Sequence, residues 1–386
     1  MAVFVAYMST IVVSALLPKI QNSLQLTFTE AGLVVVMPLT MLIFLSLAGG
    51  LLGDRYGYRR FVSIAIAVVA LGSFLRGESS TFDELLFGSA IMGFGLALMY
   101  PNLQTMIRAL FPSNLRATAT GTYSSGIASG STAAFGLTSS LLSLFGSWNN
   151  ITVLLGILGV LPLFLWITLV VEPTNSNIIQ SGQQESWKSM LTSREVLMTS
   201  LMVLFLNAIF YGLIAWLPTY LTSVRGITAN TAGLLTALLT GAEVLGLFLL
   251  PLLSDLLGVM RPLLILFFAL LGLLSIGTVY VPVRALWMTM AFVGFSIGGL
   301  FSQLLTLPAE LGGPRAAVGK KAGVILSIGY IGSLLGAPLV GYFRDISGSF
   351  ELGFASLLVF AMCAVFSGLV LPETGARHLR GGGLKE

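Results

Sequence analysis

The chain has 386 residues, of which 56% are hydrophobic and only 9% are charged. Soluble domains carry about 25% charged residues, so a water-soluble fold of this length would leave too much apolar surface in water. The composition therefore excludes a soluble globular protein and predicts helices that cross a lipid bilayer. The formal net charge of +4 does not indicate a nucleic-acid partner, because the basic residues lie in short segments between apolar runs.

Reactive side chains are scarce. Cys363 is the only cysteine and His378 is the only histidine. One cysteine cannot build a disulfide framework or a cysteine-based metal site, and we expect neither a metal nor a cofactor. No cluster of catalytic polar groups and no ATP-binding GxxxxGK[ST] loop is visible, so the sequence predicts neither an enzyme nor direct ATP coupling. The first apolar run lacks the basic leader of a cleavable signal peptide.

A helix that spans a bilayer needs about 20 mostly apolar residues. Twelve stretches meet this requirement: 1–20, 30–52, 60–76, 84–108, 117–144, 151–171, 196–221, 229–255, 262–281, 285–308, 318–343 and 352–371. The longest polar connector divides them into two sets of six. We therefore predict an all-α membrane protein with six-helix bundles at 1–172 and 196–372, a linker at 173–195 and a tail at 373–386.

Lysine and arginine placement predicts the orientation of these spans. Fourteen of the 19 basic residues fall in connectors on one side, and Lys19, Arg76, Arg225, Arg284 and Arg344 fall at the opposite ends. Cytoplasmic loops carry an excess of Lys and Arg. We therefore expect both termini and the linker to be cytoplasmic, in an integral protein of the cell (inner) membrane that works as a monomer.

The two halves repeat each other, mostly with an offset of 201 residues. Ala31-Gly32-Leu33 opens the second span and Ala232-Gly233-Leu234 opens the eighth. Gly93-Phe94 in the fourth span pairs with Gly294-Phe295 in the tenth. The repeats run in the same direction, which is typical of two parallel halves related by an axis along the membrane normal.

The loop after the second span reads GLLGDRYGYRR. Its spacing resembles the loop 2–3 signature of the major facilitator superfamily at every position, on Gly50, Asp54, Arg55, Gly57, Arg59 and Arg60. The second-half copy keeps Asp255, Gly258 and Arg261 but lacks the arginine after the aspartate. The resemblance implies a twelve-helix transporter fold, in which these nine residues form a conformational switch.

The switch role can be argued electrostatically. If the halves pack as in the family, the positive N-terminal ends of the eleventh and fifth spans face Asp54 and Asp255, and each contact is worth about 1 kcal/mol. Such contacts can close and reopen. The alternative is a purely topological role, in which the arginines hold the loop on the inner side and Gly57 permits a tight turn.

The resemblance also implies a central cavity walled by spans 1, 4, 7 and 10. The polar candidates on these spans are Tyr7, Thr10, Tyr100, Asn102, Gln104, Asn207, Tyr211, Trp216 and Gln303. Amides inside hydrocarbon are costly unless they are paired or face water, which indicates an inner wall. The alternative is hydrogen bonding between helices without solute contact. The middle thirds of these spans hold no ionisable residue, so a multiply charged substrate such as a sugar phosphate is disfavoured.

Glu243 lies deep in the eighth span. A carboxyl group at this depth can load and release a proton as access changes, which predicts a proton-coupling site. The alternative is a protonated glutamate bonded to Ser124 or Ser125 of the fifth span.

The stretch YGLIAWLPTYL, at 211–221, is similar to the seventh span of the cyanate and nitroimidazole transporter branch and of the organic-anion symporters. We expect a secondary active transporter that carries a small monoanionic or neutral organic solute by rocker-switch alternating access, with protons as partners. Two alternatives remain at this point. One is an exporter of hydrophobic compounds, and the other is a non-transporting membrane sensor on the same scaffold.

Overall fold

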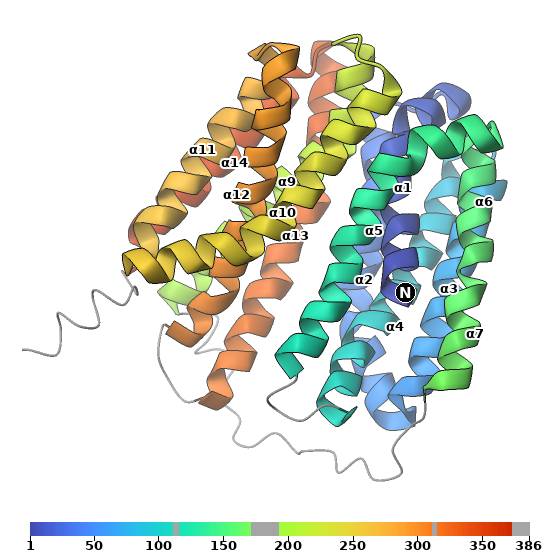
Figure 1. Ribbon diagram of the computed structural model, residues 1–386, viewed down its shortest axis with the longest axis horizontal. Helices are drawn as coiled ribbons and strands as arrows, with labels where there is room; N and C mark the ends of the chain where they lie inside the picture. The colour runs from blue at the N-terminus through green and yellow to red at the C-terminus, as the bar shows by residue number, and fades with distance from the viewer. Residues whose placement is uncertain (111–115, 171–192, 311–314, 373–386) are drawn as a thin grey trace, which may run out of the picture. The chain divides into compact units, whose positions relative to one another are not determined.

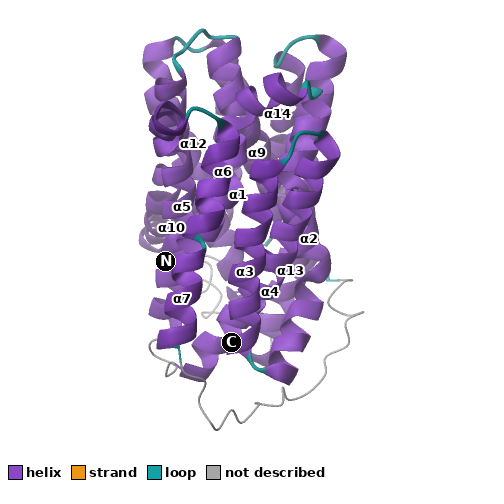
Figure 2. Cartoon of the chain, turned by 90° about the vertical axis from the view of Figure 1, so that its right-hand side faces the viewer, coloured by secondary structure: helices purple, strands orange, loops and turns teal. Residues whose placement is uncertain are grey.

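The computed structural model describes residues 1–110, 116–170, 193–310 and 315–372. These ranges are almost entirely α-helical, and no strand occurs in them (Figure 2). Within them, twelve helical segments are long and apolar enough to cross a bilayer. The predicted all-α fold with twelve spans is therefore confirmed.

The helices follow the predicted order (Figure 1). The first half contains α1 (Ala2–Leu24), α2 (Phe28–Tyr56), α3 (Tyr58–Glu78), α4 (Phe82–Leu110), α5 (Arg116–Phe145), α6 (Trp148–Leu158) and α7 (Val160–Leu169). The second half contains α9 (Arg194–Ser223), α10 (Ala229–Leu257), α11 (Arg261–Tyr280), α12 (Val283–Glu310), α13 (Arg315–Ser347) and α14 (Glu351–Val370). Most helices extend a few residues beyond the predicted apolar runs.

The start of α2 shows why a helix can extend beyond its apolar run. Thr27 and Glu30 form a capping box: the Glu30 N–H donates to Thr27 Oγ1 at 3.2 Å, and the Thr27 N–H donates to Glu30 Oε2 at 2.9 Å. These bonds satisfy N–H groups that the first turn of a helix leaves without partners. The helix therefore begins at Phe28, ahead of the apolar run.

The predicted span at 151–171 is divided into α6 and α7 at Gly159. The Gly159 N–H is shared between the carbonyl oxygens of Leu155 at 3.0 Å and Gly156 at 3.2 Å. A Cβ added at Gly159 would lie 2.8 Å from the Ala70 Cβ, so the glycine allows close contact with α3. The break is local, because Trp148–Leu169 still forms one candidate span.

The described chain forms two compact units, which we treat separately. Unit 1 comprises the described part of Met1–Ile179 together with Ala215–Ala237, and unit 2 comprises the described part of Gln180–Ile214 and Leu238–Glu386. Unit 1 thus takes in the end of α9 and the start of α10. The domain boundaries predicted from sequence stay a prediction, because most of the linker at 173–195 lies outside the described residues.

Each unit contains the same glycine crossing between helices. In unit 1, a Cβ added at Gly93 of α4 would lie 2.6 Å from the Pro38 Cα of α2. In unit 2, a Cβ added at Gly294 of α12 would lie 2.8 Å from the Leu239 carbonyl carbon of α10. Both residues of the first contact stand 201 positions before those of the second. The repeat seen in sequence is therefore also a repeat of backbone packing.

Candidate functional site: polar and ionisable side chains within the helices

The loop after α2 turns at Gly57, whose φ of 97° lies in the region that favours glycine. Gly258 takes a φ of 64° at the equivalent position after α10. The Gly57 N–H donates to the Gly53 carbonyl at 2.8 Å, and the Gly258 N–H donates to the Asp255 carbonyl at 3.3 Å. The tight turn predicted from the glycine spacing is therefore present in both repeats.

The arginines of this loop do not act alike. The Arg59 guanidinium donates to the Ile167 carbonyl at 2.6 Å, and the Trp166 indole N–H donates back to the Arg59 carbonyl at 3.2 Å. This reciprocal pair joins the start of α3 to the last turn of α7, where a cation also suits the negative end of the helix. Arg55 instead lies over the Tyr56 ring at 5.2 Å, and Arg60 is exposed.

For the remaining switch residues, the structure gives mainly the exposure of the side chains. Gly50 is half-buried, and a Cβ added there would lie 3.4 Å from the Pro101 Cβ. Asp255 is exposed, and Arg261 is half-buried at the first position of α11. The Asp54 side chain lies outside the described residues. The switch role of these residues stays a prediction.

In unit 1, two of the cavity candidates, Thr10 and Gln104, have hydrogen-bond partners in neighbouring helices or turns. Thr10 Oγ1 donates to the Ala6 carbonyl at 2.8 Å and to Met92 Sδ at 3.5 Å. Gln104 Nε2 donates to the Tyr123 hydroxyl at 2.7 Å, which links α4 to α5. Tyr7 and Tyr100 are half-buried. These positions are compatible with a wall of polar groups, and their contact with a solute stays a prediction.

Asn102 and Gln303 make the same bond in the two repeats. Asn102 Nδ2 donates to the Gly49 carbonyl at 3.0 Å, and Gln303 Nε2 donates to the Leu250 carbonyl at 3.3 Å. Donors and acceptors are again 201 positions apart, and both side chains are almost fully buried. The two amides therefore join α4 to α2 and α12 to α10, which corresponds to the helix-pairing alternative considered for them.

In unit 2, Asn207 and Tyr211 lie one turn apart on α9. Asn207 Nδ2 donates to the Val203 carbonyl at 3.0 Å and to the Gly329 carbonyl of α13 at 3.3 Å. The Tyr211 ring lies edge-on to Phe210, with 5.1 Å between ring centroids. Both residues are buried.

Trp216 belongs to unit 1 although it lies on α9. Its side chain is fully buried, and its ring centroid lies 5.4 Å from that of Phe28 at the start of α2. A Cβ added at Gly233 of α10 would lie 2.6 Å from the Phe135 carbonyl oxygen of α5. In unit 1, the end of α9 and the start of α10 therefore pack tightly on helices of the first repeat.

Glu243 lies at the crossing of α10 and α12. Its carbonyl faces Gly298, where an added Cβ would overlap it. The side chain is half-buried, and the carboxylate makes no hydrogen bond to any described residue. The equivalent position in the first repeat is Leu42, so the carboxyl group is not part of the duplicated scaffold. The Ser125 hydroxyl, one suggested partner, donates to the Thr122 carbonyl of its own helix at 2.7 Å.

Sequence reasoning missed one buried charge, Arg76. It was counted among the basic residues at outer ends, yet its side chain is fully buried between α1, α3 and α4. The side chain turns inward because Gly88 leaves room for it: a Cβ added there would lie 3.2 Å from the Arg76 Cγ. The signal that could have indicated this position is the 201-residue comparison, which places Gly277 opposite Arg76.

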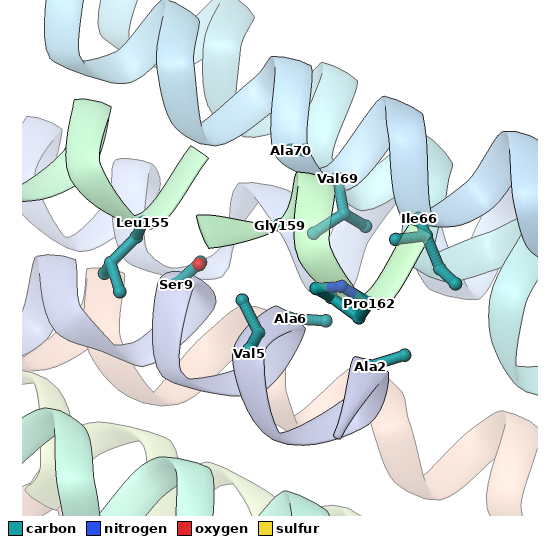
Figure 3. A pocket seen from close by; sticks show the side chains of 10 residues that line it. All are labelled: Ala2, Val5, Ala6, Ser9, Ile66, Val69, Ala70, Leu155, Gly159 and Pro162. Atoms are coloured by element: carbon teal, nitrogen blue, oxygen red, sulfur yellow. The ribbon is translucent and has the colours of Figure 1, made fainter. Parts of the chain in front are cut away.

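One small cavity lies in unit 1 between α1, α3 and the α6–α7 break (Figure 3). Its volume is about 10 Å³, and the residues that line it are Ala2, Val5, Ala6, Ser9, Ile66, Val69, Ala70, Leu155, Gly159 and Pro162. A cavity of this size holds one water molecule at most. It is too small for an organic solute.

Twelve spans, two parallel repeats and the glycine-rich loop signature together define a polytopic membrane transporter. The chain belongs to the Major Facilitator Superfamily, which matches residues 1–337. It is therefore a transporter of small solutes and not an enzyme, as the sequence predicted.

Two relatives with named solutes have moderate sequence identity to this chain. The chain is 27% identical over 361 residues to the 2-nitroimidazole transporter of Escherichia coli (strain K12), an alignment that covers 92% of this chain and 89% of the relative. It is 26% identical over 360 residues to the cyanate transport protein CynX of the same strain, with 92% and 90% covered. These relatives agree with the resemblance seen at 211–221.

Among solved structures, the fold is similar to a bacterial homolog of the human lysosomal transporter Spinster in an inward-facing and occupied conformation. The TM-score is 0.83 at 17% identity, and the match covers 96% of this chain and 94% of the other. At this identity the likeness shows the fold alone.

Proposed function

We propose that this transporter imports a small monoanionic or neutral organic solute by rocker-switch alternating access, and that Glu243 couples the movement to protons. The observation that carries the coupling is the half-buried Glu243 carboxyl group, which has no hydrogen-bond partner among the described residues. An intramembrane carboxyl group of this kind is a natural proton carrier, because it is stable there mainly in its neutral form.

The solutes named for two relatives support the proposal of a small solute. One is named for cyanate, a three-atom monoanion, and another for 2-nitroimidazole, a small planar heteroaromatic. The candidate wall supports the same class, since its members are hydroxyls, amides and aromatic rings rather than several fixed cations. A dianion would require more positive charge than these side chains provide.

Coupling is tested with Glu243→Gln in proteoliposomes. Labelled cyanate and 2-nitroimidazole serve as first solutes, followed by a panel of small organic acids and neutral heteroaromatics. We expect an inward proton gradient to raise accumulation by the wild type several-fold. Glu243→Gln should keep exchange of solute across the membrane but lose the response to the gradient, because an amide cannot carry the proton.

Glu351→Gln is the matched control, since Glu351 is exposed in the first turn of α14. It should respond to the gradient as the wild type does. An unchanged proton response in Glu243→Gln would remove the role assigned to this residue. If the wild type moves no member of the panel under any gradient, the proposed function itself fails.

We also propose that both termini face the cytoplasm of the inner membrane, on the basis of the Lys and Arg distribution. Single cysteines in a Cys363→Ser background test this arrangement. Positions 60 and 255 should be labelled by an impermeant maleimide from one side of the membrane, and positions 22 and 230 from the other. These four residues are exposed in the structure. Labelling of positions 60 and 255 from opposite sides would contradict the two-fold parallel arrangement.

A further inference from the structure

Arg76 is the feature that the proposed function leaves unused. Its side chain is fully buried, and three of its five N–H groups have partners. Nε donates to Ser89 Oγ at 2.9 Å, and one terminal nitrogen, Nη1, donates to the Ser9 carbonyl at 3.1 Å and to Met92 Sδ at 3.1 Å. The other terminal nitrogen, Nη2, is buried without an acceptor.

None of these partners carries a negative charge, and no carboxylate of the described residues pairs with Arg76. An arginine cannot discard its proton to escape burial. A buried cation without a counter-ion is strongly unfavourable for the folded state. Stability therefore does not account for Arg76.

The second repeat shows that the scaffold does not need this side chain. The equivalent position is Gly277, and a Cβ added there would meet nothing within 4 Å. The positions 201 residues after Ser89 and Met92 are Met290 and Val293, and those 200 and 201 residues after Ser9 are Ile209 and Phe210, all apolar. The polar cluster is thus specific to the first repeat, although both repeats build the same helix packing.

Met92 connects this cluster to the candidate solute wall. Its sulfur accepts from Arg76 on one side and from the Thr10 hydroxyl on the other. A methionine side chain has three rotatable bonds and adapts easily to a new neighbour. A rotamer change at Met92 would free the Arg76 Nη1 hydrogen that its sulfur now accepts, at a point that also lies within reach of the Thr10 hydroxyl. The shorter bond of that hydroxyl is to the Ala6 carbonyl at 2.8 Å.

We propose that Arg76 is the anion-recognition residue of this transporter, and that its ligand is a single small monoanionic group, such as a carboxylate or cyanate. This assignment rests on the proposed function and narrows its solute class to the monoanion. One terminal nitrogen with free hydrogens, an adaptable thioether and one nearby hydroxyl suit a group of charge −1, which forms a charge-assisted hydrogen bond to the guanidinium. The anion supplies the counter-ion that the protein itself lacks.

Arg76→Gln tests the assignment by thermal unfolding of the purified full chain. The probes are sodium cyanate, acetate and benzoate at constant ionic strength, with acetamide and benzamide as neutral counterparts. We expect at least one anion, but not its neutral counterpart, to raise the wild-type melting temperature by roughly 2 to 4 °C. Arg76→Gln should lose this shift while its own melting temperature, without ligand, is unchanged or higher. Arg284→Gln, an exposed arginine at the start of α12, should keep the shift.

Three results would contradict the assignment of Arg76 as the anion-recognition residue. The absence of an anion shift in the wild type, or its retention in Arg76→Gln, overturns the assignment. A lower melting temperature of ligand-free Arg76→Gln with the anion shift preserved indicates a structural residue instead. If Arg76→Gln does not fold, Arg76→Lys replaces it: it keeps the charge without the planar fork, so affinity should fall at least about tenfold, and unchanged affinity overturns the proposal.

Uptake and binding measurements together distinguish a failure of the Arg76 assignment from a failure of the proposed transport function. Proton-dependent uptake of neutral 2-nitroimidazole without any effect of anions would leave the transport proposal standing and remove the role of Arg76. Anion binding without uptake of any solute would support the role of Arg76 and remove the transport proposal.

Discussion

Gly294→Leu is expected to unfold the protein at a markedly lower temperature and to abolish transport. A Cβ at this position would overlap the carbonyl group of Leu239, which belongs to the backbone of α10 and cannot rotate away. The two helices would have to separate along their crossing. Overpacking typically costs about 1–3 kcal/mol, and contact with rigid backbone puts this case at the upper end. Thermal unfolding of the purified protein, followed by tryptophan fluorescence, measures the loss.

Gly277→Leu is the matched control for this change. Gly277 also lies inside a helix of the second repeat, but a Cβ added there meets no atom within 4 Å. Its replacement should be neutral or stabilise the helix by up to about 1 kcal/mol, because leucine favours helix more than glycine does. Equal effects of the two substitutions would show that the crossing of α10 and α12 is not a tight backbone contact.

Trp216→Ala should produce the second large effect. The Trp216 side chain is fully buried in unit 1, in ring contact with Phe28. Truncation of a buried tryptophan leaves a cavity that its surroundings fill only in part, at a cost of about 3–5 kcal/mol. We expect a clear fall in melting temperature, and Trp216→Phe should recover part of it because a ring remains.

Trp287→Ala provides the comparison, since the side chain of Trp287 on α12 is 41% exposed. Its loss should lower the melting temperature far less. If Trp216→Ala melts as the wild type does while solute binding is weakened, Trp216 belongs to the solute site rather than to the packing of unit 1. The original cavity assignment would then gain support.

The fold was predictable because its signals are long and redundant. Each span supplies about 20 apolar residues, and the glycines at 57 and 258 or at 93 and 294 recur in one register. Helix ends were predicted less well. The capping box of Thr27 and Glu30 lies outside the apolar run, and the break at Gly159 depends on the contact with Ala70, which lies far away in sequence.

The candidate site was only partly predictable. The sequence identified Asn102 and Gln303 as polar residues within their spans, but it could not show that each amide donates to a carbonyl of a neighbouring helix. Arg76 was correctly placed at the end of its span, but the inward direction of its side chain was not predicted. A long basic side chain near the end of a span normally extends toward the headgroups. Here the stem passes Gly88 and the guanidinium finds partners on α1 and α4, and this direction is a property of packing alone.

The unequal charges of the two repeats bear on the energetics of a transport cycle. Arg76 stands opposite Gly277, and Glu243 stands opposite Leu42, so each of these two ionisable groups has an uncharged residue as its counterpart in the other repeat. With the roles proposed above, one copy supplies a permanent positive charge and the other a negative charge that a proton can cancel. A monoanion that travels with one proton then crosses as an electrically neutral load. The membrane voltage would do no work on that loaded carrier, and the pH difference together with the solute's own concentration gradient would set the direction of flow.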